Sequence, residues 1–243
     1  MKRRATISSL IILAITLLLA VSAYSENDPF RTLGKQQAEA LQKYSEDDVV
    51  ALANGQPILR ADYEYQLAEM KYANVKADKI LKDAAEFPQA QEKILKHKQL
   101  GEKFSPEAKA LANVLSRELM YQEALKKGLK VSEEEIKDYI DWAKENMKMV
   151  RSKDAQFNEF VNTIGEDKYL EEILPKKAKQ LLLISKLKKQ ITEGVSPDNI
   201  NSEWLLYQAS LIKKADIELI DPTLTSATVE EAAKSLEALA NLK

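Results

Sequence analysis

Apolar residues recur along this chain mostly at intervals of three and four positions, the spacing that places side chains on one face of an α-helix. Leu111, Leu115 and Leu119 show this spacing. The pattern predicts helices over these ranges: 62–82, 94–100, 106–128, 133–149, 157–164, 175–189 and 204–214. The chain has only six glycines and seven prolines in 243 residues, so its composition also favours helix over sheet.

A helix end followed by a helix restart is encoded between Leu119 and Ile140. Gly128 fits the left-handed residue that follows a helix C-terminus. Ser132 and Glu135 form an S-x-x-E capping box, in which each side chain bonds the backbone N–H of the other residue. These signals predict a corner between two helices.

Two short segments have the composition of β-strands. The segment 48–58 reads as strand, turn, strand around Asn54-Gly55, a strong two-residue hairpin signal. A further strand is expected at 216–220, where apolar and polar residues alternate. Because isolated strands are unstable, the two segments are expected to pair and to close residues 48–221 into one mainly α domain with a small β element.

Both flanks of this domain look peripheral. Residues 24–47 are expected to be a polar, loosely ordered lead-in with at most a short helix over 36–44. In the tail, 222–243, Thr228 and Glu231 have the spacing of a capping box. The tail is therefore expected to hold a detachable amphipathic helix.

The N-terminus, residues 1–23, reads as an export signal. A basic start at 2–4 precedes an apolar run at 10–21, and small residues precede a cleavage position after Ala23. The alternative is an uncleaved anchor, although a spanning helix needs ~20 apolar residues. In both cases the body is expected to be extracytoplasmic, with membrane contact only through this segment.

Charge balance and missing residue types narrow the function. The 36 Lys plus Arg nearly equal the 38 Asp plus Glu, so no strong field favours nucleic acid. The chain has no cysteine, which removes disulfides, thiolate metal sites and thiol nucleophiles. His97, the single histidine, lies among lysines and is expected to be a solvated helix residue. Phosphate-binding and calcium-binding loops are also missing, so we predict no catalytic, cofactor or metal residues.

Four segments, in this order, resemble the N-terminal chaperone module of the SurA- and PrsA-like extracytoplasmic chaperones: 49–58, 119–140, 165–190 and 213–221. The resemblance implies a helical, trigger-factor-like chaperone domain that binds unfolded or partly folded secreted polypeptides without ATP. The family usually has Ser or Thr after the first hairpin, where this chain has Leu59. Asp62 is expected to cap the following helix instead.

The resemblance also implies what this chain lacks. Catalytic family members carry a parvulin prolyl-isomerase domain of about 90 residues between the last two segments, where this chain has only 191–202. We therefore expect a protein that is not an enzyme. Two alternatives stay open: a dedicated assembly factor for one partner, and a disfavoured peptidyl-prolyl isomerase.

Methionine and aromatic side chains suit surfaces that accept varied apolar partners. A cradle between helices 62–82 and 133–149 is the predicted place for such a surface. The predicted client-binding residues are Tyr63, Met70, Tyr139, Trp142 and Met147. The competing interpretation is that most of these side chains fill the core.

Overall fold

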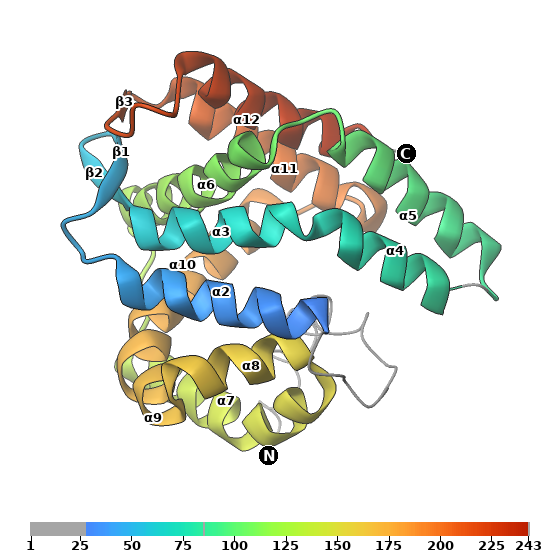
Figure 1. Cartoon of the computed structure of the whole chain (residues 1–243). Helices are drawn as coiled ribbons and strands as arrows, with labels where there is room; N and C mark the ends of the chain where they lie inside the picture. Colours follow the sequence, from blue (N-terminus) through green and yellow to red (C-terminus); the bar gives the residue numbers. More distant parts are fainter. Residues whose placement is uncertain (1–27, 85, 243) are drawn as a thin grey trace.

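The computed structural model describes residues 28–84 and 86–242, which form a mainly helical body with one small antiparallel sheet (Figure 1). This confirms the predicted fold class. The helices are α2 (Pro29–Lys43), α3 (Arg60–Lys71), α4 (Ala73–Asp83), α5 (Pro88–Gly101), α6 (Pro106–Lys126), α7 (Glu133–Lys153), α8 (Ala155–Ile164), α9 (Glu166–Lys168), α10 (Leu174–Ile191), α11 (Ile200–Lys214) and α12 (Ser226–Ala240). A π-helical turn, η1 (Tyr169–Ile173), joins α9 to α10, and a 3₁₀ turn, η2 (Pro197–Asn199), precedes α11.

The predicted signal segment, 1–23, lies outside the described residues. Within 28–84 and 86–242, no helix has both the length and the apolar character needed to cross a membrane.

The sheet joins the two ends of the domain, as predicted. Its strands are β1 (Val49–Ala53), β2 (Gln56–Leu59) and β3 (Ile217–Leu219), in the order β2-β1-β3. Both pairings are antiparallel. Asn54 and Gly55 form the β1–β2 turn with φ of 51° and 77°, which explains the Asn-Gly sequence.

An ion pair between partly exposed Arg60 and buried Asp221 fixes this junction. Nη2 of Arg60, at the start of α3, lies 2.6 Å from Oδ2 of Asp221, just beyond β3. The backbone N–H and hydroxyl of Thr223 donate to the other carboxylate oxygen at 2.8 and 2.6 Å. The backbone N–H of Asp221 also donates to the carbonyl of Val50. Asp221 therefore links the start of α3, β1 and the entry to α12.

Helix α6 is the centre of the main core, where it packs against α3, α10, α11 and α12. Its leucines Leu111, Leu115 and Leu119 are buried, together with Ile212 of α11 and Leu236 of α12. Ser105 caps α6 by accepting a bond from the backbone N–H of Ala108, so the Ser-Pro start acts as a helix N-terminus.

The expectation of a detachable tail helix is wrong. Helix α12 buries Ala232, Ala233 and Leu236 against α6 and α11. Its N-cap is Thr225, which pairs with Thr228 in the capping box. Glu231 instead accepts bonds from the backbone N–H and hydroxyl of Ser105, and so ties α12 to the start of α6.

The prediction of a loosely ordered lead-in is also wrong for residues 29–43. Residues 29–43 form α2, which lies between α3 and α8 (Figure 1). Leu33 and Ala38 are fully buried, and Phe30 is nearly so. The close approach of α2 to α8 depends on Gly34, because a Cβ there would lie 2.1 Å from the carbonyl oxygen of Gln156.

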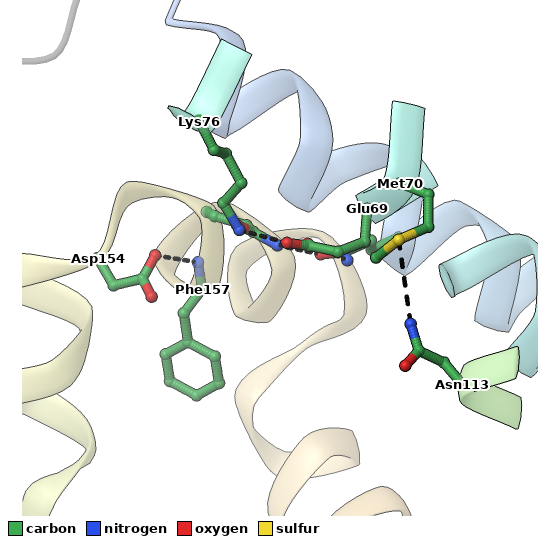
Figure 2. Close-up of polar contacts among 8 residues, drawn as sticks. Glu69, Met70, Lys76, Asn113, Asp154 and Phe157 are labelled. Carbon is green, nitrogen blue, oxygen red and sulfur yellow. Dashed lines mark hydrogen bonds and ion pairs between the residues drawn. The ribbon is translucent and has the colours of Figure 1, made fainter. Parts of the chain in front are cut away.

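A polar network holds α2, α3, α4 and α8 together. The amide of Gln156 donates to Oε1 of Gln37 at 2.7 Å and to Oε2 of Glu69 at 2.8 Å. Gln37 donates to the same Glu69 oxygen at 3.2 Å. Lys76 of α4 pairs with the other oxygen of Glu69, as Figure 2 shows. One carboxylate therefore satisfies donors from three helices.

The first long helix differs from its prediction in two ways. The range 62–82 is split into α3 and α4 at Tyr72, and α3 begins two residues earlier than expected. Asp62 does not cap α3, because Leu59 holds the N-cap position and no side chain bonds there. Asp62 instead pairs with Arg117 at 3.0 Å and Lys177 at 3.7 Å.

The predicted corner after α6 is confirmed. Gly128 has a φ of 71°, and Ser132 and Glu135 form both bonds of the capping box. Gly165 ends α8 with a φ of 93°, which a side chain would strain. Helix α7 is longer than predicted and ends at Lys153.

Replacing Gly34 with alanine is expected to lower the free energy of unfolding by about 2–3 kcal/mol, because the new methyl group forces α2 away from α8. Gly101→Ala is the matched control. A Cβ at Gly101 meets its nearest atom, Nζ of Lys109, at 3.9 Å, so this change should be neutral or slightly stabilising. Urea denaturation measures both, and equal effects would contradict the close α2–α8 packing.

Asp221→Ala is expected to cost about 2–3 kcal/mol at pH 7, because it removes a charged partner from Arg60 and Thr223. Burial opposes ionisation of Asp221, but the bonds from Thr223 and Arg60 outweigh it and lower the pKa. The lowered pKa means that this stabilisation is complete above about pH 4 and is lost as the pH falls through the folded-state pKa.

Thermal unfolding as a function of pH therefore tests the junction. The difference between native chain and Asp221→Ala should shrink in acid, whereas exposed Asp47→Ala should show little effect at any pH. A difference that does not change with pH would show that Asp221 acts through packing alone.

Candidate functional site

Helix α7 carries both buried and exposed large apolar side chains. It packs against α8 and α10 and is anchored near both ends (Figure 1). Near its start, the Lys186 ammonium of α10 pairs with Glu135 at 2.7 Å. Near its end, Arg151 bonds Asn158 at 3.0 Å and Asn162 at 2.5 Å on α8. The helix is therefore a fixed platform.

The apolar residues of α7 divide into an inner row and an outer flank. Met147 is 5% exposed and belongs to the inner row with half-buried Ile136 and Ile140. Trp142 and Met149, seven residues apart, are 37% and 48% exposed. Because residues seven apart lie on one helix face, these two large side chains share the outer flank.

Aromatic rings connect this flank to the interior. The rings of Tyr139 and Trp142 lie 6.3 Å apart. Tyr169 of η1 makes an edge contact with Phe157 of α8 at 5.5 Å. Burial, followed by the nearby Tyr139 hydroxyl, raises the pKa of Tyr169 to about 12, so both tyrosines are neutral at physiological pH. Phe157 is itself positioned by the α8 cap, where Asp154 accepts its backbone N–H (Figure 2).

The predicted client-binding residues do not form one site. Tyr63 is buried in the main core. Met70 packs on that core, with its sulfur 4.0 Å from the amide nitrogen of Asn113 (Figure 2). Met147 is buried on the inner face of α7. Tyr139 and Trp142 alone are neighbours on a partly exposed surface, so the core interpretation holds for the other three.

The predicted cradle between helices 62–82 and 133–149 is wrong. Helices α2 and α8 lie between α3 and α7 and occupy that space (Figure 1). The reason is the unrecognised helix α2, whose apolar residues are buried at the position where a client was expected.

A second exposed apolar region lies on the hairpin of α4 and α5, which projects from the body (Figure 1). Neither helix has a buried residue. Phe87 at the turn is 64% exposed, and Val75 and Leu95 are exposed on the two helices. Sequence periodicity missed Phe87 because it lies in the break before Pro88 rather than on a helix face.

The single histidine and a half-buried lysine, Lys177, have partners within the described structure. Within 28–84 and 86–242, no group of three or more His, Asp or Glu could hold a metal ion. His97 is exposed on α5, with Nδ1 2.8 Å from the carbonyl oxygen of Lys93. Burial lowers the pKa of Lys177, but Asp62 partly restores it, and the lysine lies over the ring of Tyr65. These groups have structural partners.

A family model described as the SurA-like N-terminal domain matches residues 1–188. The chain belongs to this family. No curated protein and no solved structure matches this chain. The match ends within α10, yet α11, β3 and α12 complete the core and the sheet of this SurA-like protein.

Two methionines of α7 in this SurA-like protein allow a comparison of a buried with an exposed position: Met147 is buried and Met149 is exposed. Met147→Ser is expected to cost about 2–4 kcal/mol, because it empties a buried position. Met149→Ser, two residues away, should change stability by less than about 0.5 kcal/mol. Urea denaturation monitored by circular dichroism measures both. Equal losses would show that the outer flank is covered by packing.

Proposed function

We propose that this SurA-like protein binds unfolded or partly folded polypeptides outside the cytoplasm, without ATP and without covalent chemistry. The observation that carries the proposal is the exposed flank of α7 with Tyr139, Trp142 and Met149. Membership of a chaperone-type family supports it. The basic and apolar N-terminal segment supports export, either with cleavage after Ala23 or as a retained anchor.

The chemistry of the flank suits reversible binding. Trp142 offers a rigid ring that lies tilted beside the ring of Tyr139. Met149 offers a flexible, polarizable side chain that adapts to different partners. Full burial of such a side chain contributes about 1.5–3 kcal/mol, and both are already partly covered. A single client segment is thus expected to bind with a Kd of roughly 1 mM.

Weak binding of single segments is compatible with function. An unfolded client carries several apolar segments, so dissociation of one leaves others nearby at high effective concentration. Reversible burial lowers the concentration of exposed apolar segments and slows aggregation, while rapid release allows the client to fold.

The α4–α5 hairpin favours a second candidate function. Its exposed Phe87 stands at the end of an arm that is held mainly at its base. Such an arm suits one dedicated partner, as in an assembly factor. A chaperone binds many unrelated clients weakly, whereas a dedicated factor binds one partner tightly.

Aggregation of a chemically unfolded secreted protein after dilution, followed by light scattering, tests the proposal. The native chain should suppress scattering at near-stoichiometric amounts. The double variant Trp142→Ser with Met149→Ser should lose most of this suppression. Its unfolding midpoint should fall much less than that of Met147→Ser, because Trp142 and Met149 are 37% and 48% exposed whereas Met147 is buried.

The double variant Leu125→Ser with Leu181→Ser is the matched control. It removes two leucines that are 46% and 43% exposed on α6 and α10. This control should retain suppression. Loss of suppression in both double variants would indicate general surface hydrophobicity rather than a site on α7, and loss only after Phe87→Ser would favour the arm.

A further inference from the structure

We infer that the outer flank of α7 selects polypeptide segments in which apolar residues alternate with Lys or Arg. This inference rests on the proposed function and adds the chemical class of the client. It comes from a row of carboxylates that runs beside the exposed apolar side chains.

The acidic row follows from helical spacing. It contains residues 134, 138, 141 and 145, an i, i+4, i+7, i+11 series that lies on one face of a helix: Glu134, Asp138, Asp141 and Glu145. All but half-buried Asp141 are exposed. The charges of the row are therefore available to a ligand in solution.

The acidic row is adjacent to the apolar flank. Asp138 precedes Trp142 by four residues, and Glu145 follows it by three, so both carboxylates neighbour the indole. Glu145 also precedes Met149 by four residues, which places it between the two exposed apolar side chains. A segment lying across Trp142 and Met149 would meet these carboxylates.

Partners within the protein account for only part of the row: Lys137 pairs with Asp141 and also attracts the carboxylate of Asp138. Ion pairs between α7 and other described residues include Lys137 with Asp141, Arg151 with Glu166, and Lys186 with Glu135. Glu134, Asp138 and Glu145 make no ion pair with a described residue. The lysine neighbours Lys137, Lys144 and Lys148 lie on the side of the row away from Trp142, by the same helical spacing.

Helix stability also accounts for only part of the row. Glu134 precedes Lys137 by three residues, and Glu145 precedes Lys148 by three, which is the spacing of a favourable ion pair on a helix. The helix dipole favours carboxylates in the first turn, which explains Glu133, Glu134 and Glu135 but not Asp138 or Glu145. Like charges four residues apart are unfavourable, and the row contains two such pairs, 134 with 138 and 141 with 145. Lys137 offsets part of this repulsion, and a cationic ligand would offset more of it.

The chemistry of the occupant follows. Trp142 and Met149 bury apolar side chains, and an aromatic ring also attracts a cation placed over its face. Asp138 and Glu145 attract ammonium or guanidinium groups and repel carboxylates. A segment with Leu or Phe between Lys or Arg satisfies both, whereas an acidic segment of equal hydrophobicity is disfavoured.

Titration of the full-length chain with peptides, followed by the NMR signal of the Trp142 indole N–H, tests the inference. The chain has two tryptophans, and Trp142→Phe assigns the signal. The peptides, each about ten residues long, carry identical leucines separated by Lys, Ser or Glu.

The lysine peptide should bind about fivefold more tightly than the serine peptide at roughly 10 mM salt, and the glutamate peptide more weakly than both. The preference should shrink toward zero at roughly 1 M salt, where charges are screened. Asp138→Asn with Glu145→Gln should remove the preference and retain binding. Asp198→Asn with Glu218→Gln, which changes the same net charge at exposed positions outside α7, should keep it.

The outcomes separate the inference from the proposed function. Equal binding of all three peptides at Trp142 would overturn the charge selectivity and leave the proposed chaperone function intact. No shift of the Trp142 signal by any peptide would overturn both. Broadening of this signal with rising protein concentration alone would assign the flank to a second copy of the chain, and would also overturn the inference.

Discussion

The pairing of β1 with β3 is the constraint on which the rest of this structure depends. It brings residues 49–53 beside 217–219, more than 160 positions later in the chain. Buried Asp221 then joins Arg60 to the carbonyl of Val50 and to the entry of α12. Helices α3, α11 and α12 leave this junction in fixed directions and enclose α6. Helix α10 packs against both α6 and α7, and so connects α7 to that core.

The interior uses apolar and polar contacts for different purposes. Leucines of α6 provide the burial that stabilises the core. Glu69, bonded by Gln37, Gln156 and Lys76, instead determines how α2, α3, α4 and α8 fit together. A carboxylate with three bonded partners leaves few alternative alignments of these helices, because each alternative would bury polar groups without partners.

Short sequence motifs predicted several turns and helix ends correctly. The sequence did not predict which helix faces are buried and which are exposed. The corner at Gly128, the Ser132 capping box and the Asn54-Gly55 turn are each specified by a few neighbouring residues, and all three are present. Periodicity placed Met147 on α7 but gave no means to tell that it is buried while Met149 is exposed. What covers a helix face depends on distant segments. The predicted cradle failed for this reason, since α2 fills it.

The turn between α10 and α11 is an exposed connection that suits the insertion of additional residues. Gly194 takes a φ of 78°, and most residues of 193–199 are exposed to solvent. Leu187 of α10 and Trp204 of α11 belong to one buried cluster with Met120 of α6. A folded unit inserted in the turn would leave the core undisturbed, because both flanking helices are anchored on α6. An insertion at this turn thus lengthens the chain without separating β1 from β3.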